Sequence, residues 1–299
     1  MAKSAAARAA ANKAADAKYF WAGKFDPVKL RAAFLKEFSK VRNFDPAVVP
    51  HMEMLVGFMA ADPKITDVRW MAYMLATAYW ETTTLEKEVV PRLGKKHQPL
   101  RDKHGKILVR TVHRWLVTMA PVTEVGHGRG RAYHLPVKVE SLPNGEAHVI
   151  EEDGDEFTVT AKGGIKALTK GAHMGAPATQ HATKAYTDDK NKAHAYYGRG
   201  YVQLTWWSNY AKAGVELGLG LQLLLNPDEV LKPTVAYRLM AYGMRTGQGF
   251  ANGHKFTNYF NGTKTDYVNA RHMVNGHDHA ADIAHIAVKF AAVLLAAKS

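Results

Sequence analysis

Apolar residues recur every three or four positions from Asp26 to about Thr84, with prolines at positions 27, 46 and 63 as interruptions. That spacing places the apolar side chains on one face of successive helices, and a proline ends one helix or begins the next. This part of the chain is therefore predicted to form a helical lobe.

Helical spacing returns in the last third of the chain. It covers residues 206–217, where Gly218 would end the helix, and a segment that Pro233 would begin and Gly247 would end. It also runs through residues 283–297, whose apolar side chains form one stripe. A mainly α fold is expected.

Between these helical regions the period changes to two. From Pro136 apolar and polar residues alternate, and Asn144-Gly145 and Asp153-Gly154 occupy turn positions, so residues 136–162 are predicted to form a small three-stranded β-meander. Residues 85–115 are rich in charge and contain a predicted exposed turn at residues 102–106. We interpret both segments as insertions into one domain of residues 19–299.

Residues 1–18 have a different composition, rich in Ala, Lys and Arg with few large apolar side chains. Such a segment has little with which to pack against a core, and it is interpreted as a mobile basic arm. It also lacks the continuous apolar stretch of a secretory signal, and no run of about 18 apolar residues follows it. Neither a signal peptide nor a membrane span is expected.

The formal net charge of +13 indicates an anionic partner, because a field of that sign concentrates polyanions near the protein. Nucleic acid is not the expected partner: the 40 Lys and Arg are spread along the whole chain, and no zinc-finger, RNP or homeodomain pattern is present. The absence of cysteine excludes disulfides and thiolate metal sites, and leaves carboxylates, histidines and hydroxyls for chemistry.

Glu81 is the first candidate for chemistry. It follows Ala78 by three positions and Met74 by seven, so it lies along the apolar stripe of the predicted helix from Asp67 to Thr84. A carboxyl shielded from water there resists ionisation, as a general acid near neutral pH should. A solvated glutamate at a helix end is the alternative interpretation.

A second candidate is the segment that begins at Gly198. Two glycines permit close approach of the backbone to a ligand, and the following alternation predicts a short strand that would put Gln203 and Thr205 on one face. The segment matches neither a dinucleotide fingerprint nor a phosphate loop. A tight structural turn is the alternative.

These segments together resemble glycoside hydrolase family 19, which contains chitinases and lysozyme-like phage endolysins. The resemblance covers roughly Ala72 to Thr84, Thr118 to Tyr133 and Tyr196 to Gly276. It rests on Trp80-Glu81-Thr82-Thr83 and, most specifically, on Gly198-Arg199-Gly200-Tyr201-Val202-Gln203-Leu204-Thr205 with Asn209-Tyr210. It implies a mainly α, lysozyme-like fold with two helical lobes around a cleft, to which the β-meander is added.

The resemblance also implies roles for individual residues. Glu81 matches the family's general acid, Glu124 the second carboxylate, and Thr205 the hydroxyl that positions the attacking water. Glu86 and Glu88 compete with Glu124, because 43 positions separate Glu124 from Glu81. The positions expected to bind or surround substrate are Arg199, Tyr201, Gln203, Asn209, Arg271 and Asn275.

Other side chains invite further interpretations. The pair His277 and His279 flanks Asp278, but no recognised ligand pattern accompanies it, so neither a metal nor another cofactor is expected. Aromatic residues around the glycine segment are expected either to stack on sugar rings or to fill the core. They are Tyr196, Tyr197, Tyr201, Trp206, Trp207 and Tyr210.

The expected function is hydrolysis of the peptidoglycan glycan backbone by a monomeric endolysin or virion-associated lysin, with inversion at the anomeric carbon. The enzyme would wait in the host cytoplasm until lysis or travel in the virion. Its basic arm would contact anionic membrane or wall. A chitinase of the same fold and a non-catalytic glycan-binding or virion structural protein are the alternatives, and a nucleic-acid-binding protein would rest on charge alone.

Overall fold

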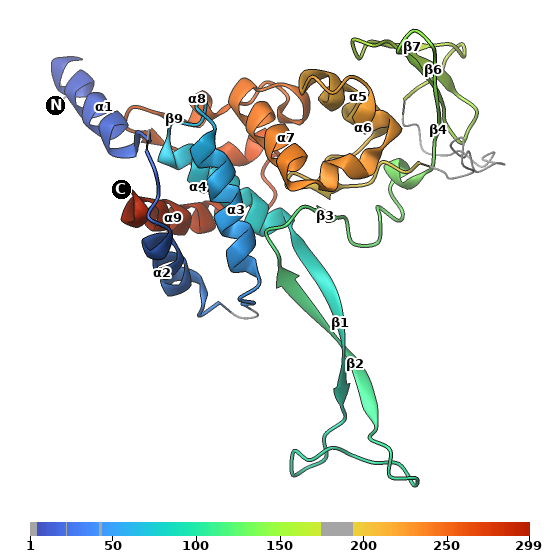
Figure 1. Cartoon of the computed structure of the whole chain (residues 1–299). Helices are drawn as coiled ribbons and strands as arrows, with labels where there is room; N and C mark the ends of the chain where they lie inside the picture. The colour runs from blue at the N-terminus through green and yellow to red at the C-terminus, as the bar shows by residue number, and fades with distance from the viewer. Residues whose placement is uncertain (1–4, 22, 42–43, 175–193) are drawn as a thin grey trace.

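A computed structural model describes residues 5–21, 23–41, 44–174 and 194–299 (Figure 1). Within them, helices dominate and strands form small sheets, which confirms the predicted mainly α fold. The α-helices are α1 (Ala5–Tyr19), α2 (Pro27–Phe38), α3 (Val48–Ala61), α4 (Val68–Glu81), α5 (Trp207–Glu216), α6 (Gln222–Leu225), α7 (Pro233–Thr246), α8 (Phe256–Tyr259) and α9 (Ala280–Ala297). Short 3₁₀ helices are η1 (Ala132–His134), η2 (Pro227–Leu231), η3 (Gly249–Ala251) and η4 (Asn269–Met273).

Helix α4 is the central helix of the fold. It begins at Asp67, whose carboxylate accepts a hydrogen bond from the backbone N–H of Arg69 at 2.7 Å. From Val68 to Tyr79, Trp70 is the only residue that is not buried, so the helix contacts protein on every side. Its last residue is Glu81, whose position is therefore set by packing along the preceding three turns.

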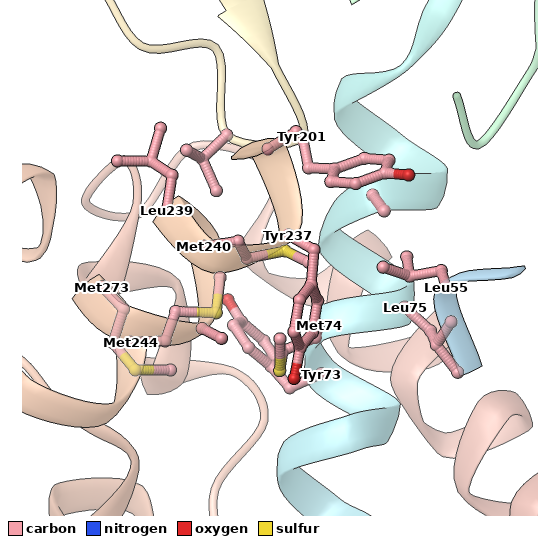
Figure 2. Close-up of a cluster of buried hydrophobic side chains, with 14 of the residues drawn as sticks. Leu55, Tyr73, Met74, Leu75, Tyr201, Tyr237, Leu239, Met240, Met244 and Met273 are labelled. Carbon is pink, nitrogen blue, oxygen red and sulfur yellow. The ribbon is translucent and has the colours of Figure 1, made fainter. Parts of the chain in front are cut away.

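The core around α4 is built from helices far apart in sequence. Figure 2 shows Tyr73 and Met74 of α4 on the side of Met240 and Met244 of α7, while Leu75 lies on the other side of α4 beside Leu55 of α3. Methionine side chains are flexible enough to fill the irregular space between such crossing helices. The core thus joins the N-terminal and C-terminal helical regions.

Helix α9 packs against α4 and α2. By length and composition alone it is the one helix among the described residues that could cross a membrane, yet half of it is buried inside the protein. Its buried side chains include Ile283 and Phe290, and the Phe290 ring lies against Phe34, Phe38 and Tyr79. These contacts make α9 a core helix of the fold.

The strands form four small sheets. They are β1 (Thr83–Pro91) with β2 (Val109–Val117), β3 (Val122–Thr123) with β8 (Arg199–Gly200), β9 (Phe260–Asn261) with β10 (Lys264–Thr265), and β4 (Lys138–Ser141), β5 (Ala147–Ile150), β6 (Glu156–Val159) and β7 (Ile165–Ala167) in that order. All of the pairings are antiparallel.

Both segments interpreted as insertions form β structure among the described residues. Residues 85–115 lie in a long β1–β2 hairpin that projects from the helical body (Figure 1), with Thr83 paired to Val117 at its base. The predicted meander is a four-stranded sheet instead of three-stranded, because β7 adds a strand beyond residue 162. Phe157 of this sheet packs against Trp207 of α5, with ring centroids 5.3 Å apart.

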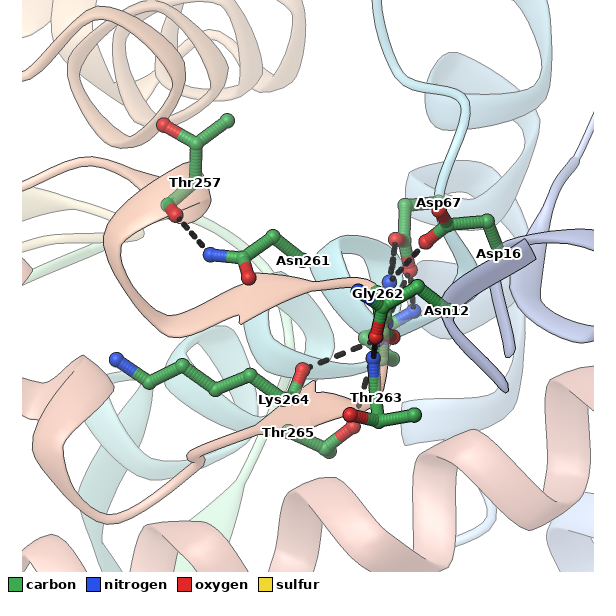
Figure 3. A network of polar contacts seen from close by, with 10 residues as sticks. Asn12, Asp16, Asp67, Thr257, Asn261, Gly262, Thr263, Lys264 and Thr265 are labelled. Carbon is green, nitrogen blue, oxygen red and sulfur yellow. Dashed lines mark hydrogen bonds and ion pairs between the residues drawn. The ribbon is translucent and has the colours of Figure 1, made fainter. Parts of the chain in front are cut away.

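Most of the segment expected to be a mobile arm is helix α1, although residues 1–4 lie outside the described part of the chain. Figure 3 shows how its second half contacts the body through polar groups. The side-chain oxygen of Asn12 accepts a hydrogen bond from the backbone N–H of Thr263 at 3.1 Å, and Asp16 lies 3.7 Å from the guanidinium of Arg69. Arg69 is buried and also donates to the Gly262 carbonyl at 2.8 Å. Polar contacts thus replace the apolar ones that the segment lacks.

Buried tyrosines predict a loss of stability in alkali. Burial raises the pKa of Tyr73, Tyr201 and Tyr210 above the ordinary value. The folded protein then holds these protons more tightly than the unfolded chain, so their stabilisation is complete below about pH 10 and is lost as the pH rises further. Urea unfolding from about pH 8 to 11 should show a decline of at most about 1.4 kcal/mol per pH unit for each tyrosine.

Tyr201→Phe is the matched variant for this test. The Tyr201 hydroxyl is buried without a hydrogen-bond partner among the described residues, so its removal should leave the free energy of unfolding at pH 7 unchanged or raise it by up to about 1 kcal/mol. Above about pH 10 the free energy of unfolding should fall less steeply in the variant, because one fewer buried tyrosine contributes to the decline. If the free energy of unfolding falls equally steeply with pH in wild type and variant, the raised pKa of Tyr201 is contradicted.

Candidate active site

A cleft of about 440 Å³ opens where α4 ends. Its walls come from the end of α4 and the start of β1, from β3 and η1, from the turn after β8, and from the segment after η4. The lining residues are Trp80, Glu81, Thr83, Val122, Thr123, Glu124, Val125, Tyr133, Val202, Gln203, Thr205, Val274 and Asn275. The cleft therefore brings together five residues that sequence analysis proposed: Glu81, Glu124, Gln203, Thr205 and Asn275.

Glu81 is held by a buried arginine. Its side chain is 16% exposed, and its Oε1 accepts a hydrogen bond from Nη1 of Arg271 at 2.6 Å. The Nε of Arg271 donates to the backbone carbonyl of Asp278 at 2.9 Å, which fixes the plane of the guanidinium. Arg271 is buried behind the cleft. The structure thus places it as a residue that orients Glu81.

Glu124 is held by two hydrogen bonds, one to each carboxyl oxygen. The Tyr133 hydroxyl donates to Oε1 at 3.0 Å, and the backbone N–H of Gly198 donates to Oε2 at 3.0 Å. Burial is the largest cause of a raised pKa for Tyr133, and the hydrogen bond to Glu124 raises it further, so Tyr133 keeps the proton that it donates. A carboxylate with two fixed donors is well oriented for work as a base.

Gly198 fills a position with no room for a side chain. A Cβ added there would lie 2.7 Å from the Gln203 side-chain oxygen and 3.2 Å from the Glu124 Cβ. Both neighbours line the cleft, so even a methyl group would have to push them apart. The glycine is needed for this close approach, since its own φ is not positive.

The predicted strand from Gly198 to Thr205 is wrong beyond Gly200. Backbone hydrogen bonds between Arg199 and Leu204 in both directions close a tight turn, and Gly200 and Gln203 have φ of +83° and +49°. Gln203 and Thr205 nevertheless both reach the cleft. The side-chain amide of Gln203 donates to the carbonyls of Val122 and Gly200, which ties the turn to β3.

Three other proposed residues lie behind the cleft wall. Arg199 is buried, donates to the Asp228 carboxylate at 2.8 Å and stacks its guanidinium on Tyr197 at 3.8 Å. Tyr201 is fully buried. Asn209 donates from its side chain to the Thr205 carbonyl at 2.9 Å. The structure places all three as supports of the turn, because none lines the cleft.

The aromatic side chains of the cleft are not among those expected to stack on sugar rings. Trp80 and Tyr133 line it, whereas Tyr196, Tyr201, Trp207 and Tyr210 are buried in the core. Trp80 directly precedes Glu81 in the motif that carries the resemblance, and this proximity was the available signal. Tyr133 had no comparable signal, because it lies nine positions from Glu124 in a stretch without regular period.

The competitors of Glu124 lie elsewhere. Glu86 and Glu88 are exposed on the β1–β2 hairpin and do not line the cleft, and Glu88 lies 3.6 Å from Arg114 in an ion pair. Glu124 is the second carboxylate that the structure brings to the same cleft as Glu81. The cleft also has hydroxyl and amide groups from Thr205, Gln203 and Asn275 beside these carboxylates.

The histidines near the C-terminus do not gather into a ligand set. Within the described ranges no group of three or more His, Asp or Glu side chains is placed to hold a metal ion. His279 instead packs its ring 4.7 Å from that of Trp80 and lies 3.3 Å from the Asp282 carboxylate. It thus supports the cleft wall next to Glu81.

Comparison with known proteins covers one part of the cleft. Residues 162–277 match a family model described as chitinase class I, the model of glycoside hydrolase family 19. That region contains the turn after Gly198 together with Arg271 and Asn275, but it excludes Glu81 and Glu124. No solved structure matches the chain.

Two curated plant proteins match over a short region. An acidic endochitinase, pcht28, of Solanum chilense is 41% identical over 59 residues, which cover 19% of this chain and 23% of the relative. An acidic 26 kDa endochitinase of Solanum lycopersicum is 43% identical over 54 residues, 18% of this chain and 21% of the relative. The match therefore spans less than a quarter of each relative. Together with the family model, these similarities indicate a glycoside hydrolase that is similar to family 19 over residues 162–277.

Proposed function

We propose that the protein is a glycoside hydrolase that cleaves the glycan backbone of bacterial peptidoglycan by acid/base hydrolysis with inversion. The observation that carries this proposal is the meeting of Glu81 and Glu124, from separate segments, in one cleft of about 440 Å³. Hydrolysis of a glycosidic bond needs two carboxyl groups on opposite sides of the sugar. The similarity to class I chitinases supports the same chemistry.

In the proposed mechanism, Glu81 protonates the oxygen of the leaving sugar. Arg271 engages only Oε1, so Oε2 is left for the glycosidic oxygen. Glu124 accepts a proton from water, and its two hydrogen bonds keep the carboxylate aimed while Thr205 holds the same water. An inverting reaction needs roughly 6.5–9.5 Å between the carboxyl groups to leave room for that water.

Peptidoglycan is the proposed substrate because the protein carries a net charge of +13 and bacterial walls carry anionic groups. Chitin is the second candidate, because both plant relatives are named endochitinases. On the peptidoglycan proposal the protein is a monomeric lysin of a phage, acting from the host cytoplasm at lysis or from the virion.

The first test measures new reducing sugar ends released from purified peptidoglycan, with fragments identified by mass spectrometry. Glu81→Gln should lower the rate by at least about 1000-fold, because the amide has no proton of suitable acidity to donate. Its oxygen can still accept the hydrogen bond from Arg271, but the buried guanidinium loses its counter-charge, so thermal unfolding of the variant is measured alongside to separate lost stability from lost catalysis. Glu124→Gln should lower the rate by at least about 100-fold.

The matched control is Glu88→Gln, a carboxylate of the hairpin that does not line the cleft, which should retain wild-type activity. Loss of activity in Glu88→Gln with a mild effect of Glu124→Gln would transfer the second role to Glu88. Release of sugar ends from chitin oligomers but not from peptidoglycan would establish the chitinase alternative. Failure of the wild type on both polymers would leave a glycan-binding protein as the better account.

A second test examines the close approach at Gly198. Gly198→Ala places a methyl group against Gln203 and Glu124, so both groups should shift by a few tenths of an ångström or more. We expect kcat to fall by about 10- to 100-fold, since small displacements of a catalytic group are costly. The change in KM should be smaller.

The control for steric damage of a general kind is Gly126→Ala, at a nearby glycine where an added Cβ meets nothing within 4 Å. Its φ of +79° costs stability on its own. A loss of kcat in Gly126→Ala as large as in Gly198→Ala would show that local destabilisation, and not the position of Glu124, explains the effect.

A further inference from the structure

The far end of the β1–β2 hairpin is a strongly basic exposed surface that the proposed chemistry does not use. We define the hairpin tip as residues 89–110. It carries seven Lys or Arg and one acidic residue, Asp102. The Asp102 carboxylate accepts hydrogen bonds from the backbone N–H groups of His104 and Lys106, so it serves to close a turn.

The hairpin tip is also apolar on its surface. Val89, Leu93, Leu100 and Val109 are all among the exposed large hydrophobic side chains, with Val89 at 64% and Leu93 at 53%. The described chain has 14 such side chains, and four of them fall in these 22 residues. Soluble surfaces rarely gather apolar and basic side chains in this way unless they meet a partner.

The hairpin tip is ordered although it has no core. Beyond the last strand pair, backbone hydrogen bonds run from Leu100 to Arg92, from Leu108 to Leu100 and from Arg92 to Leu108, and they close a ring. Two short turns extend from this ring, residues 94–98 and 102–106. Figure 1 shows them spread to either side at the end of the hairpin. The turns display two pairs of exposed lysines: Lys95 and Lys96 on one, Lys103 and Lys106 on the other.

We infer that the hairpin tip is a docking site for the surface of an anionic lipid bilayer. Lysine and arginine attract the phosphate headgroups, while exposed leucine and valine side chains enter the boundary between headgroups and acyl chains. A hydrated anionic polymer would use the charges but would leave the four apolar side chains in water. Because the hairpin tip exposes basic and apolar side chains together, a lipid surface is the favoured partner.

Helix α1, the other basic element at the edge of the fold, fits a bilayer less well. Its exposed side chains are mainly Ala, Lys and Arg, with Asn12 and Asp16, and it has no large apolar side chain before Tyr19. An interfacial helix needs such side chains on one face. The anionic contact expected of the N-terminal segment is thus better supported for the hairpin tip.

Docking through the hairpin tip would also set the height of the active site. Strands β1 and β2 pair over nine positions, and at about 3.3 Å per residue the tip stands roughly 30 Å from the hairpin base, where Thr83 lines the cleft. A lysin docked in this way would hold its cleft about that far above the membrane. The glycan it cuts would be the layer at that distance.

The experiment is flotation of the full chain with vesicles of phosphatidylglycerol or of phosphatidylcholine, at about 0.1 M salt. Wild type should float with the anionic vesicles and stay behind with the neutral ones. Lys95→Glu/Lys96→Glu should lower the partition coefficient by at least about 30-fold, since each lysine contributes about a factor of five at such a surface. Equal binding of wild type to both vesicles would overturn the inference.

Arg8→Glu/Lys13→Glu is the control of equal charge change on α1, where both side chains are exposed. It should lower partitioning by less than about threefold. A loss confined to this control, or none in the hairpin variant, would overturn the inference. All four side chains are exposed, so thermal unfolding should be unchanged in both variants.

Leu93→Ser/Leu100→Ser separates lipid from a hydrated polyanion. It leaves every charge in place, and we expect it to lower partitioning by at least about tenfold because two apolar side chains no longer enter the bilayer. Unchanged partitioning would show that the tip recognises charge alone, and would favour an anionic polymer. High salt provides a further test with the same anionic vesicles. The wild type should keep part of its binding there, and its complete release would count against insertion of the apolar side chains into the bilayer.

Discussion

Burial of helix α4 along most of its length is the constraint on which the proposed active site depends. Its buried residues are mostly apolar and point in all directions around the helix, so neighbouring helices from both ends of the sequence enclose it, and its axis cannot shift without repacking them. Glu81 stands at the end of this fixed helix, where the surrounding helices stop and the cleft begins. The carboxyl group proposed as the general acid is thus held in position by the core.

The two carboxyl groups are held by different means, which suits their different proposed tasks. Glu81 has one charged partner, Arg271, from a segment 190 positions away. Glu124 has two neutral donors, a backbone amide and the Tyr133 hydroxyl. The single contact with Arg271 leaves Oε2 of Glu81 for the substrate, whereas the two hydrogen bonds to Glu124 fix both of its carboxyl oxygens. A buried guanidinium also makes the Glu81 site sensitive to changes far along the chain, because Arg271 would otherwise be an unpaired charge in the core.

Much of the fold could be predicted because it follows from period and punctuation. The helices ending near Thr84 and Gly247, and the turns of the inserted sheet, were readable from spacing, proline and glycine. Strand β7 was not, since its three residues are too short to show alternation. The turn after Gly200 was not either, because alternating residues look alike in a strand and in a turn closed by Arg199 and Leu204. Which side chains face the cleft depends on tertiary contacts, so Arg199 and Tyr201 share a motif with Gln203 yet lie behind it.

The β1–β2 hairpin lies between the two carboxyl residues in sequence: β1 begins at Thr83, just after Glu81, and β2 ends at Val117, shortly before Glu124. An antiparallel pair brings its two ends back to neighbouring positions whatever its length, and here Thr82 and Thr118 are joined at the base by hydrogen bonds from the Thr118 N–H and hydroxyl to the Thr82 carbonyl. Residues can therefore be added to or removed from the far end in cross-strand pairs without moving the carboxyl groups. The distance from the hairpin tip to the cleft can thus be changed, by natural variation or by design, independently of the chemistry at the hairpin base.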